Sequence, residues 1–108
     1  KTLLYATDMG AWPQPTWDYL EKARPQIHLA VMEATHASGE LGPNGVHMNF
    51  RTLLEYRSRL LSLRIIREDT PFFATHFSHN GAALHEDMET ALSGSGVLPA
   101  YDGLRIEV

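Results

Sequence analysis

The chain has 108 residues, of which 44% are hydrophobic and 20% charged, a composition typical of one small globular domain. Its net charge of −4 leaves no broad basic surface to neutralise nucleic-acid phosphates, so no nucleic-acid partner is expected. Cysteine is absent, which excludes disulfides and thiolate metal ligands and leaves carboxylates and imidazoles as side-chain ligands. No apolar run approaches the roughly 20 residues of a membrane span. We therefore expect no membrane partner and a cytoplasmic, reducing location.

The amino-terminal third predicts a strand, a short helix and a second strand. Residues 2–6 form an apolar run typical of a strand covered on both faces, and the acid Asp8 follows at its carboxyl end. A helix is expected over about 16–22, because Pro15 and the proline two residues before it should forbid an earlier start. The second strand is expected over 27–33, where apolar residues fall on both faces.

A long loop follows the second strand. Residues 34–48 contain three glycines and one proline, and they carry His36 and His47. A loop of about 15 residues inside a compact domain is more often functional than idle. His28, by contrast, is expected to mark only the entry to the preceding strand.

A longer helix is expected over 50–63, with Asn49 as its N-cap. Its apolar residues recur on one face at helical spacing, which indicates a helix packed on a sheet. Arg57 is expected to lie in solvent.

The stretch 72–80 carries most of the chemistry. A short apolar strand ends abruptly there and is followed at once by His76 and His79, with Asn80 and Gly81 as turn residues. Ligands in α/β proteins bind at the carboxyl ends of strands. Histidine is the commonest metal ligand and the usual proton carrier near neutral pH.

The remaining chain predicts a helix over 81–93 and two short strands, 97–101 and 104–108, around the turn at Asp102 and Gly103. The complete order is β-α-β-α-β-α-β-β. Alternation of this kind predicts an α/β fold with a mostly parallel sheet, formed as a single domain over 1–108.

Polar side chains follow three of the predicted strands. Asp8 follows the first, His36 and His47 the second, and His76 and His79 the third. Carboxylate and imidazole in one crevice suit zinc, manganese or iron, and one carboxylate can hold two ions that together activate a hydroxide at neutral pH. The same residues are also consistent with hydrogen-bonded loops that hold no metal.

Four segments of the chain resemble the carboxyl-terminal half of the metallo-β-lactamase-fold hydrolases. Within that family they are most similar to the cyclic phosphodiesterases of phosphonate breakdown, with the tRNA 3′-processing ribonucleases as cousins. The segments are 4–10 (LYATDMG), 44–48 (NGVHM), 74–80 (ATHFSHN) and 101–106 (YDGLRI). They stand in the family's order and span nearly the whole chain. The resemblance implies half of an αββα sandwich and a dinuclear metal-dependent phosphodiesterase that uses a metal-bound hydroxide.

The resemblance also implies a role for each polar residue. Asp8 would bridge the two divalent ions, zinc or manganese or iron, and His76 would bind one of them. His47 would stand over the substrate and stabilise or protonate the leaving oxygen. His79 would lie beside the ligands or at the pocket rim, and His36 either in the pocket or in a structural position.

The chain departs from this family in one respect. The His-x-His-x-Asp-His signature is absent, and so is a later histidine that precedes the Asp8 segment. We therefore expect a fragment with an incomplete metal site, inactive alone. Its partners would be a small phosphodiester and the missing amino-terminal half.

The face turned toward that missing half should be apolar and should favour self-association. It would be built from Leu3, Tyr5, Leu29 and Val31, or from their alternates.

Two alternatives remain open at this point. The chain could be a metal-free binding or assembly module of the same half-fold. It could also belong to a hydrolase of this fold that acts on RNA, a lactone or a thioester.

Overall fold

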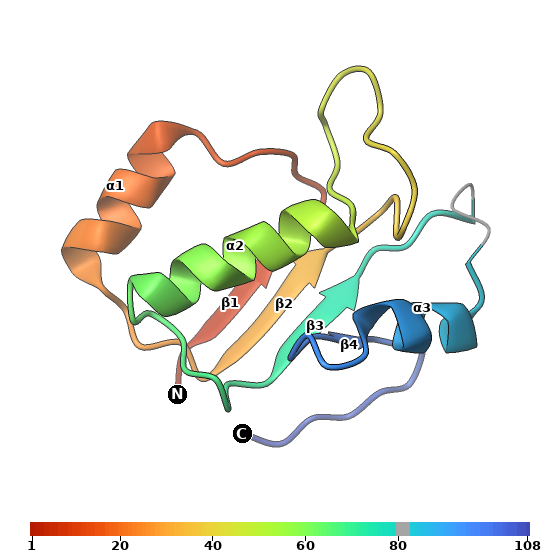
Figure 1. The fold of residues 1–108 in the computed structure, drawn as a ribbon. Helices are drawn as coiled ribbons and strands as arrows, with labels where there is room; N and C mark the ends of the chain where they lie inside the picture. Colours follow the sequence, from red (N-terminus) through yellow and green to blue (C-terminus); the bar gives the residue numbers. More distant parts are fainter. Residues whose placement is uncertain (80–82) are drawn as a thin grey trace.

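The computed structural model describes residues 1–79 and 83–108. Its elements form a four-stranded, wholly parallel sheet in the order β1-β2-β3-β4, with three helices (Figure 1). They are β1 (Leu3–Ala6), α1 (Gln14–Ala23), β2 (Leu29–Glu33), α2 (Phe50–Ser62), β3 (Phe72–Thr75), α3 (His85–Leu92) and β4 (Leu98–Pro99). The predicted α/β class and parallel sheet are confirmed.

The first helix begins earlier than expected. Pro13 is the N-cap of α1 and Pro15 lies in its first turn. The first N–H groups of a helix have no partner within the helix, so a proline there removes no hydrogen bond. The expectation that the helix waits until Thr16 was wrong for this reason.

Helix α2 begins where the sequence predicts. The backbone N–H of Thr52 donates to the side-chain oxygen of Asn49 at 3.0 Å, which is an N-cap bond. The side-chain amide of Asn49 also donates to the carbonyl of Gly39 at 2.9 Å. One residue therefore ends the long loop, starts the helix and ties the two together.

Arg57, expected in solvent, is buried. Its side chain is 9% exposed, and Nη2 lies 3.3 Å from both the carbonyl and a carboxylate oxygen of Glu68. The turn after α3 also covers it, because a Cβ on Gly96 would come within 2.4 Å of Nη2. Arg57 lies at helical spacing from the buried Phe50, Leu53 and Leu60, so the expectation that it lies in solvent was wrong. A segment distant in sequence closes over its side chain.

The carboxyl-terminal part differs most from expectation. Helix α3 starts at His85 rather than at 81, and the expected start falls partly on 80–82, outside the described residues. The second of the two expected strands, 104–108, is not formed, and β4 pairs in parallel with β3. The turn itself is present: the N–H of Leu104 donates to the carbonyl of Tyr101 at 3.1 Å. A two-residue strand leaves too short a ladder for a returning hairpin partner.

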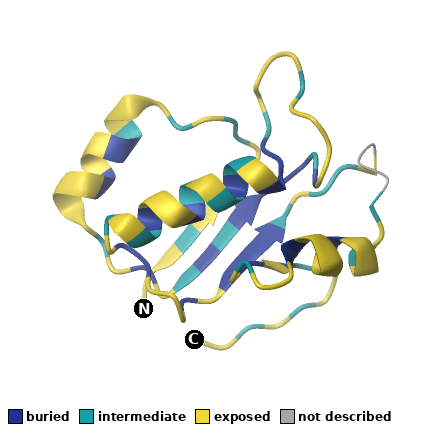
Figure 2. Ribbon diagram, viewed as in Figure 1, coloured by how far each residue is buried: buried dark blue, intermediate teal, exposed yellow. Residues whose placement is uncertain are grey.

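Burial increases across the sheet, from β1, where exposed and half-buried residues alternate, to β3, which is buried along most of its length (Figure 2). In Figure 1, α2 crosses the front of the sheet, with α1 on the β1 side and α3 on the β4 side. The core beneath the helices contains Trp17, Leu20, Ala30, Met32, Leu53, Leu60, Phe72, Ala74, Met88 and Leu92.

The opposite face is apolar and open at its two edge strands, β1 and β4. Strand register pairs Leu3 with Leu29, Tyr5 with Val31, and Phe73 with both Val31 and Leu98, and directly paired residues share a face. Leu3, Tyr5 and Leu98 are 55%, 66% and 59% exposed.

None of the helices within residues 1–79 and 83–108 is long and apolar enough to cross a membrane.

Candidate functional site

A buried carboxylate, Glu33, lies at the centre of the carboxyl-terminal edge of the sheet. It is the last residue of β2 and its side chain is fully inaccessible. Its two oxygens accept hydrogen bonds from the Met9 N–H at 2.5 Å, His47 Nδ1 at 2.9 Å, the Met48 N–H at 3.1 Å, and Thr35 through Oγ1 at 2.5 Å and N–H at 3.4 Å. A buried charge is tolerated only when its lone pairs are satisfied in this way.

The hydrogen bonds also keep Glu33 ionised. Burial on its own raises the pKa of the Glu33 carboxyl, but the bonds donated to it, most strongly those from Thr35 and His47, outweigh burial. The pKa therefore lies below its usual value. At neutral pH Glu33 is a carboxylate that accepts protons in hydrogen bonds and donates none.

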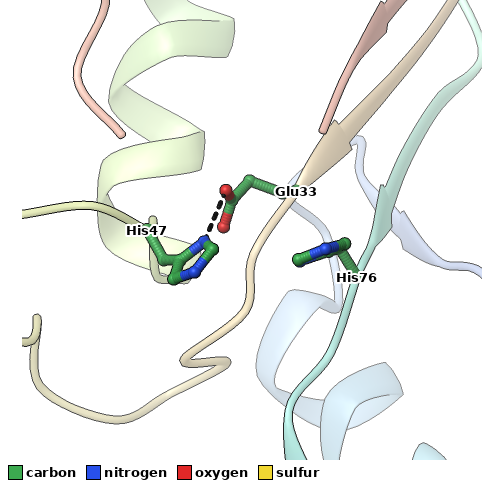
Figure 3. Close-up of side chains that lie close together, drawn as sticks. All are labelled: Glu33, His47 and His76. Carbon is green, nitrogen blue, oxygen red and sulfur yellow. Dashed lines mark hydrogen bonds and ion pairs between the residues drawn. The ribbon is translucent and has the colours of Figure 1, made fainter. Parts of the chain in front are cut away.

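His47 comes from the end of the long loop, and its ring points at Glu33 (Figure 3). His47 Nδ1 lies 2.9 Å from Glu33 Oε1, and its side chain is 26% exposed. Because the carboxylate can only accept, Nδ1 carries the proton of the neutral ring. The second ring nitrogen, Nε2, then keeps a free lone pair.

His76 follows β3 and faces the same carboxylate region (Figure 3). Its Nδ1 lies 2.9 Å from Thr35 Oγ1, and its ring centroid is 5.5 Å from that of His47. The backbone of His76 is left-handed, with φ of 63°, a conformation that is uncommon outside glycine and often marks functional loops. The N–H of Ser78, which donates to the carbonyl of Thr35 at 3.0 Å, holds this turn in place.

Glu33, His47 and His76 each offer one ligand atom within 4.8 Å of the others, an arrangement that could hold a metal ion. We refer to these three residues as the Glu33 cluster. Glu33 already accepts five hydrogen bonds, whereas each imidazole retains one free nitrogen. The geometry therefore resembles the pattern in which a carboxylate orients histidines while the histidines meet the ligand.

Asp8 lies at the same edge of the sheet but is not a member of the Glu33 cluster. It is exposed and its backbone is left-handed, with φ of 54°. The next residue, Met9, donates to Glu33, and Gly10 packs so tightly that a Cβ there would meet the Gly45 carbonyl at 2.1 Å. The loop that carries Asp8 thus packs closely against the loop that carries His47.

The other expected site residues are spread around the Glu33 cluster. His36 is half-buried, with its ring centroid 6.0 Å from that of His47. His79 is exposed on the loop after β3, and the neighbouring Asn80 and Gly81 lie outside the described residues. His28 precedes β2 and accepts the N–H of Thr2 through Nδ1 at 3.0 Å, in keeping with its expected place at the strand entry.

A cavity of about 370 Å³ adjoins His76 at the ends of β3 and β4. Its lining is Thr75, His76, Phe77, Ala100, Tyr101 and Asp102. Asp102, expected only as a turn residue, therefore also lines an open pocket beside a candidate ligand.

Sequence reasoning missed Glu33 and Thr35. A signal was present: Glu33 is the one charged residue of an otherwise apolar run, Leu29–Glu33, and Ala-Thr-His follows it directly. Burying a charged side chain in a strand costs free energy unless the charge is paired. A buried carboxylate at this position therefore requires hydrogen-bond donors around it.

Comparison with protein-family models, curated proteins and solved structures gave no match to this chain.

Proposed function

We propose that this chain is the substrate-facing half of a divalent-metal-dependent hydrolase of the metallo-β-lactamase class, acting on a small or cyclic phosphodiester. The observation that carries the proposal is the hydrogen bond between the buried Glu33 carboxylate and His47 Nδ1, at 2.9 Å. It stands at the edge of the sheet where Asp8 and His76 also lie, and ligands bind at this edge in parallel α/β folds.

In this proposal His47 is the proton donor to the leaving oxygen. The Glu33 carboxylate holds the ring through Nδ1 and stabilises the imidazolium form, so that Nε2 can carry and release a proton. The partial exposure of His47 leaves the ring open to a substrate. A positioned acid of this kind typically contributes roughly 10²–10⁴ in rate.

Asp8 and His76 are the proposed metal ligands. The fit rests on the donor set: His76 Nδ1 is engaged by Thr35, which leaves Nε2 for an ion, and imidazole with carboxylate suits zinc, manganese or iron. Divalent ions at such a site would supply Lewis acidity and an activated water. Two ligands do not complete a site, so the other ligands would come from an amino-terminal half packed on the open sheet face.

The metal assignment has a direct test in the protein that joins this chain to such an amino-terminal half. Asp8→Ala should lower the occupancy of both metal ions, whereas His76→Ala should lower the occupancy of one ion more than that of the other. Elemental analysis after dialysis measures both effects. His85→Ala is the control, because His85 pairs with Glu89 on α3. Unchanged metal content in Asp8→Ala would reject the bridging role.

The role of His47 is tested by comparing leaving groups. His47→Ala should keep its metal and lose roughly 10²–10⁴ in kcat on an alkyl ester, whose leaving oxygen needs a proton. The loss should shrink on a p-nitrophenyl ester, because p-nitrophenolate leaves without one. An equal loss on both esters, with metal retained, would show that His47 only braces its loop.

The alternative of a metal-free assembly module is favoured by one observation, the open apolar face of the sheet. It predicts no stoichiometric metal in the complete protein and no hydrolysis of phosphodiesters, lactones, thioesters or RNA. The same elemental analysis and a panel of these substrates distinguish the two functions.

A further inference from the structure

Thr35 connects Glu33 to His76 through a single hydroxyl group. Thr35 Oγ1 lies 2.5 Å from Glu33 Oε2 and 2.9 Å from His76 Nδ1. The residue is buried, and its N–H also points at Glu33 Oε2, at 3.4 Å. No water or other donor is needed to explain these contacts.

A hydroxyl group has one proton to donate, and the contacts decide where it goes. The ionised Glu33 carboxylate has no proton, so at 2.5 Å the Thr35 hydroxyl must be the donor. Toward His76 the same oxygen then presents only lone pairs. The 2.9 Å contact is therefore made by an N–H of His76, at Nδ1.

We infer that Thr35 is a positioning residue that fixes His76 in the Nδ1–H tautomer and leaves Nε2 as the free nitrogen. The inference deepens the proposed function, which needs a free Nε2 on His76 to bind metal. It does not depend on hydrolysis, since the tautomer is a property of the ring and its neighbours.

The same carboxylate serves both histidines by different routes. Glu33 Oε1 reaches His47 directly, and Glu33 Oε2 reaches His76 only through the Thr35 hydroxyl. Loss of that hydroxyl should therefore affect His76 and spare His47. His47 is thus a control within the same molecule.

The chain also contains a reference for the opposite tautomer. His28 accepts the N–H of Thr2 through Nδ1, so the proton of its neutral ring lies on Nε2. His28 is exposed at the other end of β2, away from the Glu33 cluster. One spectrum of this chain should therefore show both tautomers.

The experiment is a long-range ¹H–¹⁵N correlation spectrum of the imidazoles in the uniformly labelled 108-residue chain, without metal. It is recorded at a pH high enough that the imidazole ¹⁵N shifts no longer change with pH. Rings are assigned with single His→Gln variants. We expect His47 and His76 to show a protonated Nδ1 and His28 a protonated Nε2. A protonated Nε2 on His76 in this wild-type spectrum would overturn the inference without any variant of Thr35.

Two substitutions then test whether the Thr35 hydroxyl sets the tautomer of His76. Thr35→Val keeps the side-chain shape and removes the hydroxyl, so His76 should shift toward the Nε2–H tautomer or a mixture while His47 stays unchanged. Thr35→Ser restores the hydroxyl and should restore the wild-type His76 signals. An unshifted His76 in Thr35→Val, or a Thr35→Ser that behaves like Thr35→Val, would overturn the role of the hydroxyl. Should Thr35→Val fail to fold, Thr35→Ala, which also removes the hydroxyl, takes its place and is judged by the same His76 signals.

A metal readout separates this inference from the proposed function. In the complete protein, Thr35→Val should weaken metal affinity by about 10–100-fold, as loss of a partner behind a ligating histidine commonly does. If the tautomer shifts and the metal affinity does not change, the role of Thr35 stands and the ligand role of His76 fails.

Discussion

Glu33 accepts hydrogen bonds from two separate loops, and the Thr35 hydroxyl connects it to a third loop. The N–H of Met9 comes from the loop after β1, and Thr35 and His47 come from the loop after β2. The Thr35 hydroxyl extends the network to His76, after β3. One carboxylate thus connects the three loops that carry Asp8, His47 and His76, and its charge state should affect the stability of the fold as well as the chemistry of the site.

Substitution of Glu33 by glutamine should change the acid side of the stability curve. The folded pKa of Glu33 lies below its unfolded value of about 4.3, so its ionised form stabilises the fold above that value. This contribution is lost as pH falls through the folded pKa. Glu33→Gln should therefore lower the free energy of unfolding at pH 7 by roughly 1–3 kcal/mol, because the donors around Glu33 lose their charged acceptor. Below about pH 4.3 the stability of the variant should fall less steeply with pH than that of the wild type.

Urea unfolding at a series of pH values measures this effect. Glu55→Gln is the matched control, because Glu55 is exposed on α2 and its substitution should leave the curve almost unchanged. Parallel pH slopes for wild type and Glu33→Gln would contradict the assigned charge state.

At the scale of elements, the site depends on contact between the loops after β1 and β2. Gly10 lies against the backbone at Gly45 and Val46, with no room for a side chain. Farther along the first loop, the N–H of Trp12 donates to the Tyr56 hydroxyl on α2 at 2.8 Å. The loop that carries Asp8 is therefore held at both ends, against the His47 loop and against the helix.

Gly10→Ala should force these two loops apart. The added Cβ would meet a backbone carbonyl, which cannot move as a side chain can, and overpacking of this kind typically costs 1–3 kcal/mol. The free energy of unfolding from urea titration measures the cost. Gly42→Ala is the control, because a Cβ there would make only ordinary contacts, at 3.6 Å, with the His36 ring. Equal, small effects for both variants would show that the loops are not in close contact.

At the scale of the whole molecule, the chain buries one face of its sheet and leaves the other apolar face open. Leu3, Tyr5 and Leu98 are more than half exposed on that face. Between them by strand register lie Leu29 and Val31, which are half-buried, and Phe73, which is buried. These residues carry no charge. Contiguous apolar patches of this kind are rare on stable monomers and mark interaction surfaces.

The isolated chain should therefore self-associate through this face. Multi-angle light scattering should give a mass above that of a monomer that rises with concentration. Tyr5→Lys combined with Leu98→Lys should return the chain to a monomer, because a charge on each side of the face makes its burial costly. Tyr19→Lys is the control: Tyr19 is 67% exposed but lies on α1. A clean monomer of the wild-type chain at all concentrations would count heavily against the half-fold proposal.

Much of the architecture could be predicted from sequence, since its causes are local. Apolar runs and the intervening helical periodicity predicted β1, β2, β3, a longer version of β4, three helices and a parallel sheet, and Asn49 predicted the start of α2. Strand alternation also grouped Leu3, Tyr5, Leu29 and Val31 on one face before any register was known. Backbone sterics, capping and side-chain alternation act over a few residues, so a single sequence reveals them.

The remaining features depended on contacts between distant segments. Local pattern does not reveal the partners of Glu33, the pairing of Arg57 with Glu68 or the absence of a strand at 104–108. The Glu33–His47 hydrogen bond joins residues 14 apart in sequence, and the Thr35–His76 hydrogen bond joins residues 41 apart. Sequence could place an acid and several histidines at strand ends. Only the tertiary structure showed which carboxylate meets which imidazole, because that pairing depends on how three loops pack against one another.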